Sequence, residues 1–287
     1  MTTTLVHPTT PRRKARHSAA DISPDAAAAL DRFFHQLAHA RHRPLLLLDY
    51  DGTLAGFRVD RFHARPWAGV RQQLQRIQRQ GRTRIAVITG RPAAEIAPML
   101  ALDHPIEVWG LHGAERLHPN GHRELEDAPP ATRARLDEIR AHLRRDALGG
   151  LYEDKPNAAV MHWRGHTPAR ARQIEERTRA LFEPLAHLEG IALLEFEAGI
   201  ELRVGRDKGG AVRQIIAESG NDSPVTYLGD DLSDEAAFRV VNLAGGPHLS
   251  VLMRRAWRAT AADVWLQPPA GLRTFLARWE SVDAATA

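Results

Sequence analysis

Two aspartates follow an unbroken apolar run in the segment LLLLDYDGTL, which spans residues 45–54. A run of this kind is typical of a strand buried on both faces of a parallel sheet. Because side chains alternate along a strand, Asp49 and Asp51 leave its end on the same side, and Gly52 then permits a sharp turn. Paired carboxylates at this edge of an open α/β sheet can hold a hard cation such as Mg2+ and leave one oxygen free to attack phosphorus.

Three more sets of polar residues stand at the ends of expected strands or at the start of an expected helix. They are Thr89 after strand 85–88, Lys208 at the start of a helix, and Asp230, Asp231 and Asp234 after strand 225–228. Phosphoryl transfer needs a nucleophile, a metal ion, donors to the phosphate oxygens and a proton shuttle, and these residues together can supply all of them. The sequence therefore predicts a phosphoryl-transfer site.

The aspartates divide into reacting groups and metal ligands. Asp49 is the predicted nucleophile, which forms an aspartyl phosphate, and Asp51 is the predicted acid and base, which protonates the leaving oxygen and then activates water. Mg2+ is expected on Asp49, the backbone carbonyl of Asp51 and Asp230. Asp231 and Asp234 are expected to complete or orient the water shell of the metal. Adjacent acids at a strand end repel each other unless a cation is present, which supports this assignment.

Thr89 and Lys208 are the predicted phosphate-binding groups, through a hydroxyl and an ammonium. Taken alone, each has an ordinary structural interpretation. The segment from Thr89 to Pro92 also fits a cap between a strand and a helix, and Lys208 followed by two glycines fits a first helical turn. An EF-hand calcium loop does not fit the first aspartate pair, because its glycine is fourth rather than sixth and a strand precedes it. The order of all the sets along the chain favours catalysis.

Alternating strand and helix patterns predict an α/β fold with a doubly wound, mainly parallel, Rossmann-type sheet for residues 21–128 and 205–287. Between them, residues 129–204 show a helix, a hairpin, a second helix and a second hairpin. This pattern indicates an inserted α+β layer. Residues 1–20 carry several arginines and no acid, which is typical of a disordered tail.

The composition narrows the kinds of partner. Of the 287 residues, 43% are hydrophobic and 26% charged, as in an ordinary globular protein, and no stretch approaches the about 20 apolar residues of a membrane helix. Without cysteine there are no disulfides or thiolate metal sites, and we expect a cytoplasmic protein.

The formal charge is only +4 and the arginines are scattered, so neither nucleic acid nor a membrane is expected as a partner. No obligate protein partner is evident, and the basic excess suits an anionic small molecule.

The sequence resembles the haloacid dehalogenase-like phosphatases over about residues 44–276. The four motifs of that group occur here in the same order: the aspartate pair, Thr-Gly-Arg at 89–91, Lys208 and the cluster from Asp230. Finer motifs narrow the resemblance to the trehalose-6-phosphate phosphatase family: GLHGAE at 110–115, EDK at 153–155, HWR at 162–164, ELR at 201–203 and DDLSDEAAF at 230–238. The resemblance implies a Mg2+-dependent phosphatase with an aspartyl-phosphate intermediate. Its reaction would be the hydrolysis of trehalose 6-phosphate to trehalose and phosphate, the last step of trehalose biosynthesis.

The resemblance also implies how the sugar phosphate is recognised, because in this family the inserted layer is a cap that closes over the core and determines substrate specificity. The substrate-binding residues that it implies are Thr89, Gly90, Arg91, His112 and Gly113 in the core and Glu153, Lys155 and Glu201 in the cap. Acids paired with a lysine suit a polyhydroxyl ligand. His162 and Arg164 are interpreted as support for the cap strand.

Other functions compete with this one. A near alternative is a phosphatase for another glycosyl phosphate, such as sucrose phosphate or a mannosyl-glycerate phosphate. A catalytically silent regulatory partner of a trehalose synthase is disfavoured because the catalytic residues are intact, and a dehalogenase because it needs no acid at Asp51. Thr89 and Ser233 depart from the commonest family form but keep a hydroxyl. The segment 55–64, rich in arginine and aromatic residues, is expected to influence how the substrate enters.

Overall fold

Four consecutive leucines form a central strand, β1, Leu45–Leu48, in the larger of two sheets. All four side chains are buried, because Leu46 and Leu48 contact the hydrophobic layer on one face of the sheet and Leu45 and Leu47 the layer on the other. The structure, a computed structural model, describes residues 24–58, 60–126, 130–145, 151–155, 157–186, 191–196 and 198–286. The predicted tail of residues 1–20 lies outside these residues.

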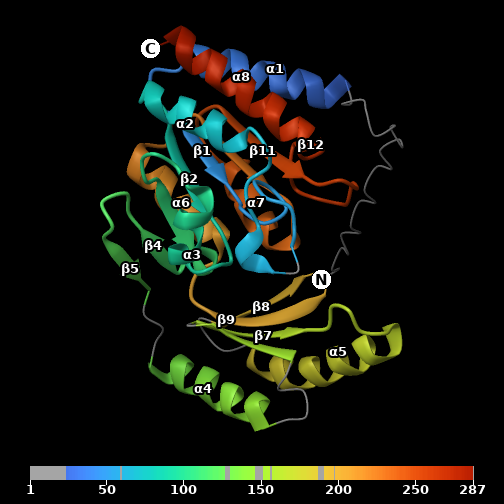
Figure 1. Cartoon of the computed structure of the whole chain (residues 1–287). Coiled ribbons are helices and arrows are strands. Elements are labelled where there is room, and N and C mark those ends of the chain that lie inside the picture. Colours follow the sequence, from blue (N-terminus) through green and yellow to red (C-terminus); the bar gives the residue numbers. More distant parts are fainter. Residues whose placement is uncertain are drawn as a thin grey trace, which may run out of the picture.

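The larger sheet has the strand order β12-β11-β10-β1-β2-β3-β4-β5, and Figure 1 labels several of these strands. Besides β1, its strands are β2 Arg84–Ile88, β3 Glu107–Gly110, β4 Glu115–Leu117, β5 Arg123–Leu125, β10 Val225–Gly229, β11 His248–Met253 and β12 Val264–Leu266. The strands from β12 to β3 are parallel, and β4 and β5 add an antiparallel edge. Because β10, β1 and β2 are parallel neighbours, their carboxyl ends lie side by side.

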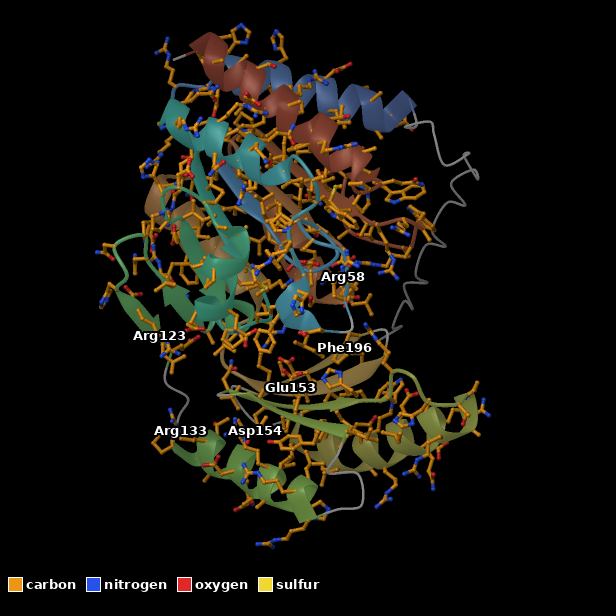
Figure 2. The ribbon with its side chains drawn as sticks, in the orientation of Figure 1. Arg58, Arg123, Arg133, Glu153, Asp154 and Phe196 are labelled. Carbon is orange, nitrogen blue, oxygen red and sulfur yellow. The ribbon has the colours of Figure 1, made fainter. Side chains whose placement is uncertain are left out.

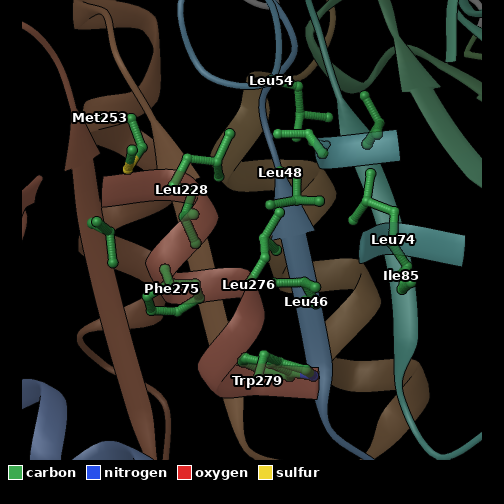
Figure 3. Close-up of a cluster of buried hydrophobic side chains, with 14 of the residues drawn as sticks. Leu46, Leu48, Leu54, Leu74, Ile85, Leu228, Met253, Phe275, Leu276 and Trp279 are labelled. Carbon is green, nitrogen blue, oxygen red and sulfur yellow. The ribbon is translucent and has the colours of Figure 1, made fainter. Parts of the chain in front are cut away.

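Helices cover both faces of this sheet. The helices on one face are α1 Pro24–His39, α2 Val70–Gln80, α3 Ala93–Leu100 and α8 Ala270–Thr286, and those on the other are α6 Lys208–Ser219 and α7 Glu235–Val241. Figure 3 shows Phe275, Leu276 and Trp279 of α8 in the first layer, packed with Leu46 and Leu228 of the sheet. The prediction of a doubly wound, mainly parallel α/β fold is confirmed.

The second sheet belongs to a layer inserted between β5 and α6, which we call the small layer (residues 130–204). Its strand order is β6-β7-β9-β8, with β6 Tyr152–Lys155, β7 Ala158–His162, β9 Gly199–Val204 and β8 Ile191–Phe196. Helices α4, Pro130–Arg145, and α5, Pro168–Phe182, cover the face that carries Ile200, Leu202 and Val204. Figure 1 shows the small sheet between the core and these two helices, and side chains alternate along β9, so its other residues lie on the face toward the core.

Short helical turns join several of these elements. They are η1 Arg61–His63, η2 Leu111–Gly113, η4 Glu183–Leu185 and η5 Leu232–Asp234. Where the small layer joins the core, Glu126 accepts hydrogen bonds from the backbone and the side chain of Arg206, at 3.3 and 3.1 Å. Every helix in the described part of the chain is too short or too polar to cross a membrane.

Candidate active site

The parallel strand ends bring the predicted core residues together. Asp49 follows β1, Thr89 follows β2 and Asp230 follows β10, and all three side chains are buried. Lys208 reaches them from the first turn of α6, and its ammonium donates to Asp49 Oδ1 at 2.7 Å and to Asp234 Oδ1 at 2.8 Å. Residues that are far apart in the sequence thus form one buried polar site.

Asp234 is held by four hydrogen-bond donors. Its Oδ1 accepts from Lys208 Nζ and from the Tyr227 hydroxyl, and its Oδ2 accepts from the backbone N–H groups of Asp230 and Asp231, both at 2.9 Å. Burial raises the pKa of this carboxyl, but Lys208 and the hydrogen bonds from Tyr227 and Asp231 together outweigh burial, so the pKa is lowered overall. Both oxygens are engaged, so Asp234 fixes the loop after β10.

The charge at the site fits a divalent cation. Asp49, Asp230 and Asp234 each offer a carboxylate oxygen within 4.8 Å of the others. Burial is the main cause that raises the pKa of Asp49 to about 7, against the lowering effect of Lys208. Burial and the carboxylates of Asp49 and Asp234 raise the pKa of Asp230 well above its usual value. The cluster therefore holds more carboxylates than one lysine balances, and Mg2+ prefers such oxygen ligands.

Gly52 lets the turn after β1 approach the loop after β10. Its φ is +83°, and a Cβ atom at this position would lie 1.9 Å from Asp230 Oδ2. A side chain at residue 52 would therefore displace a predicted metal ligand. In the same turn, the hydroxyl of Thr53 is buried and has no hydrogen-bond partner among the described residues.

Asp51, the predicted acid and base, forms a bidentate ion pair with Arg91. Arg91 Nε lies 2.6 Å from Asp51 Oδ2, and Arg91 Nη2 lies 2.5 Å from Asp51 Oδ1. The sequence resemblance implied that Arg91 is a substrate-binding residue, and in the structure its guanidinium contacts the carboxylate of Asp51. This pair joins the ends of β1 and β2.

The turn at His112 extends the site toward the small layer. His112 has a φ of +58° and Gly113 a φ of +105°, both in the left-handed region, which is strained for a histidine. A hydrogen bond from His112 N to the Thr89 carbonyl, at 2.8 Å, holds this turn. The imidazole packs against Gly90, where a Cβ atom would lie 2.7 Å from His112 Nε2. Across the boundary between the layers, His112 Nε2 lies 3.4 Å from Glu201 Oε1.

The core-facing side of the small sheet carries the remaining predicted residues. Strand pairing places Glu153 in one row with Glu201, and Lys155 in the next row. Figure 2 shows Glu153 and Phe196 at the boundary between the layers. Glu153 also contacts the ring of His162, Nε2 to Oε2 at 2.9 Å, which fits the supporting role expected of that histidine. The side chain of Lys155 lies outside the described part of the structure.

Arg203 belongs to the ELR motif at 201–203 but is not among the predicted site residues. It pairs with Ala158 in the row of Lys155, and its side chain is only 1% exposed. Its Nε and Nη2 have no hydrogen-bond partner among the described residues, and burial lowers its pKa, against Glu201 and Asp207. A buried guanidinium of this kind is suited to an anionic or polyhydroxyl ligand. One feature of the sequence could have indicated this position: Arg203 stands two residues after Glu201 on the same expected strand, so both side chains lie on one face.

The segment 55–64 lies at the same boundary. The guanidinium of Arg164, in the small layer, is 5.6 Å from the ring centroid of Phe57, which is half exposed. Figure 2 shows Arg58 on the core side, opposite Phe196. The part of this segment around Phe57 and Arg58 therefore lies at the boundary between the two layers.

The fold and the order of the acidic, hydroxyl and lysine groups along it define a haloacid dehalogenase-like protein. The C-terminal domain of a Candida albicans trehalose-6-phosphate phosphatase has the same fold, with a TM-score of 0.72 and 20% sequence identity over 89% of this chain and 96% of that chain. The C-terminal domain of a Candida albicans trehalose synthase regulatory protein is also similar, with a TM-score of 0.69 and 12% identity over 90% of this chain and 99% of that chain. At these identities the likeness concerns the fold alone.

The chain belongs to the trehalose-phosphatase family, whose model matches residues 47–264. A trehalose-phosphate phosphatase of Mycobacterium marinum is 31% identical over 255 residues, which are 83% of this chain and 62% of that protein. The chain thus spans about three fifths of the length of that relative. The resemblance inferred from the motifs is confirmed at the level of the family.

Proposed function

We propose that the protein is a Mg2+-dependent phosphatase that hydrolyses trehalose 6-phosphate to trehalose and phosphate. The observation that carries the proposal is the buried cluster in which Lys208 contacts Asp49 and Asp234 beside Asp230. This arrangement supplies a nucleophile, a fixed positive charge and metal ligands at one point. Membership of the trehalose-phosphatase family supports the choice of substrate.

In the proposed reaction, Asp49 attacks phosphorus and forms an aspartyl phosphate, while the bond from phosphorus to the sugar oxygen breaks. Asp51 gives its proton to that oxygen. Asp51 then takes a proton from water, and the hydroxide attacks phosphorus, so that the bond to Asp49 breaks and phosphate leaves. Lys208 and Thr89 stabilise the charge on the phosphate oxygens.

Mg2+ would be held by the carboxylates of Asp49 and Asp230 and by the backbone carbonyl of Asp51. Asp231 and Asp234 would orient the surroundings of the metal. Bound Mg2+ would neutralise charge on the phosphate and on the carboxylates. The four hydrogen bonds to Asp234 keep the loop that carries Asp230 in place. The chain thereby provides oxygen ligands from two neighbouring strand ends.

Residues 129–204 would act as a cap on a core formed by residues 21–128 and 205–287. Glu153, Lys155, Glu201 and Arg203 would bind the sugar hydroxyls, because carboxylates accept hydrogen bonds and the two cations donate them. The approach of Glu201 to His112 supports this role, since it joins the sugar side of the site to the phosphate side.

Two alternatives are tested by the same experiment. Another glycosyl phosphate would use the same core with different cap contacts. A regulatory role is the second alternative, because the C-terminal domain of a trehalose synthase regulatory protein has the same fold. The intact cluster of Asp49, Asp230 and Lys208 favours catalysis, since a regulatory domain has no need of it.

The test is phosphate release with Mg2+ on trehalose 6-phosphate, sucrose 6-phosphate, a mannosyl-glycerate phosphate and p-nitrophenyl phosphate. We expect the highest kcat/KM on trehalose 6-phosphate and its loss in Asp49→Asn. A better rival sugar phosphate would overturn the choice of substrate. Equal rates for Asp49→Asn and the parent would overturn the catalytic assignment.

A further inference from the structure

Arg91 and Asp51 form a bidentate ion pair beside the site. Both guanidinium contacts are short, and the side chains are only 10% and 25% exposed. Other groups fix the arginine as well. Its guanidinium lies 5.8 Å from the ring centroid of Tyr50, and its Nη1 lies 3.8 Å from the sulfur of Met99.

The geometry of the pair determines what Arg91 can do for Asp51. A side-on guanidinium donates one N–H to each carboxylate oxygen, which fixes the plane of the carboxylate. Each oxygen keeps a further lone pair for another partner. The carboxylate is therefore held in one orientation without being blocked as a proton acceptor.

The backbone of Arg91 links this pair to the phosphate side of the site. Its N–H donates to Thr89 Oγ1 at 3.2 Å, and its carbonyl accepts from Leu111 N at 2.9 Å. Three neighbouring parts of the site are thus connected through one residue: the Thr89 turn, the turn that carries His112, and Asp51. A residue connected in this way is suited to set the position of a neighbouring reacting group.

We propose that Arg91 is a positioning residue that holds the carboxylate of Asp51 in the orientation needed for proton transfer, and that it acts through Asp51 and not as a phosphate-binding group. The inference rests on the proposed function, because the acid/base role of Asp51 belongs to it. It changes the role that the sequence resemblance implied for Arg91, from contact with the substrate to control of the acid and base.

The first test separates proton transfer from phosphate binding, with Arg91→Gln and Arg91→Lys in the full chain with Mg2+. We expect kcat on trehalose 6-phosphate to fall about 10–100-fold in Arg91→Gln. The inhibition constant of inorganic phosphate should change less than about threefold. On p-nitrophenyl phosphate the loss should be smaller, because p-nitrophenolate leaves without a proton. Arg91→Lys keeps the charge but not the fork, so it should remain impaired.

Arg79→Gln is the matched control, because Arg79 also pairs with an aspartate, Asp103, but on the exposed surface of the core. It should leave both activities unchanged. If Arg91→Gln does not fold, Arg91→Lys, which leaves no carboxylate without a cation, provides the same comparison.

The second test is a double-mutant cycle on p-nitrophenyl phosphate, on which Asp51→Asn should retain measurable activity. If Arg91 acts through Asp51, adding Arg91→Gln to Asp51→Asn should cost less than about twofold. A further large loss, with a weaker inhibition by phosphate of the same size, would overturn the proposal and make Arg91 a phosphate-binding residue. Failure of the proposed function would show differently, as an Asp49→Asn variant as active as the parent.

Discussion

Lys208 Nζ lies 2.7 Å from Asp49 Oδ1 in a buried pair, although 159 residues separate the two along the chain. Burial favours the neutral form of this lysine, but the carboxylates of Asp234 and Asp49 outweigh burial and raise its pKa well above the usual value. The ammonium therefore stays charged where phosphate would bind. Because Asp49 precedes the small layer and Lys208 follows it, the two halves of the core must come together before the site exists.

Replacing Lys208 by Met should remove this fixed charge without a large change in volume. We expect kcat to fall about 10²–10³-fold, as for the loss of one fixed electrostatic group in an active site. In the presence of a chelator, unpaired buried carboxylates should also lower the free energy of unfolding by about 3–5 kcal/mol. Chemical denaturation measures this cost. The double variant Asp49→Asn/Lys208→Met should regain part of the stability, and equal stability of parent and Lys208→Met would contradict the explanation.

Gly52→Ala should disturb the metal site through Asp230. A Cβ at residue 52 would lie 1.9 Å from Asp230 Oδ2, at a φ of +83°. We expect the Mg2+ concentration for half-maximal activity to rise at least about tenfold, since a misplaced ligand binds the ion less well. Gly121→Ala is the control, because Gly121 has a φ of +85° and a Cβ there would meet no atom of the described residues within 4 Å. The same effect in both variants would assign it to backbone strain alone.

Binding of Mg2+ should stabilise the parent protein and not Asp230→Asn. A ligand at about 100 times its Kd stabilises the native state by about 2.7 kcal/mol. For a chain of this size that corresponds to a rise in Tm of about 4–5 °C. Calorimetry with and without Mg2+ measures the shift without relying on activity. Glu138→Gln, which changes an exposed carboxylate of α4, should respond as the parent does.

The sequence was sufficient for the parts of the fold and site whose signal is local. The apolar run of β1 has no polar alternation, because both of its faces are buried. Asp49, Lys208 and Asp230 each stand next to a strand or helix with a strong pattern, so their meeting followed from the parallel order of the strands.

The parts that were not predicted depend on distant contacts. Strands β4 and β5 have three residues each, ERL and REL, with no hydrophobic period, and they form because they pair at the edge of an existing sheet. The pair of Arg91 with Asp51 joins residues 40 positions apart, so no local spacing indicates it. The burial of Arg203 likewise depends on how the small sheet faces the core.

The stability of the core should depend on pH through Glu218, which lies far from the proposed metal ligands. Burial raises its pKa, but hydrogen bonds from Arg116 at 2.7 Å and Arg84 at 2.8 Å outweigh burial and lower the pKa to about 2. A group with a lowered pKa in the folded state stabilises the protein above its ordinary value of 4.5, and this contribution is lost as the pH falls from 4.5 toward 2.

We therefore expect Glu218→Gln to be less stable than the parent at pH 6, by about 1 kcal/mol because solvent screens the pair in part. The difference should shrink at pH 3. Urea denaturation at the two pH values measures it. A difference that stays constant with pH would mean that packing, and not charge, accounts for the effect of Glu218.

Glu201→Gln should separate recognition of the sugar from the chemistry on phosphate. Glu201 is buried, faces the core from β9 and lies 3.4 Å from His112 Nε2. A carboxylate accepts from sugar hydroxyls at both oxygens, and an amide at one, so KM for trehalose 6-phosphate should rise about tenfold or more. KM for p-nitrophenyl phosphate, which has no sugar, should stay the same. Glu195→Gln is the matched control, since Glu195 lies on the same hairpin but pairs with Arg179 on the helix side. If Glu201→Gln weakened both substrates equally, its role would lie in the core chemistry and the small layer would lose its main support as the sugar-binding cap.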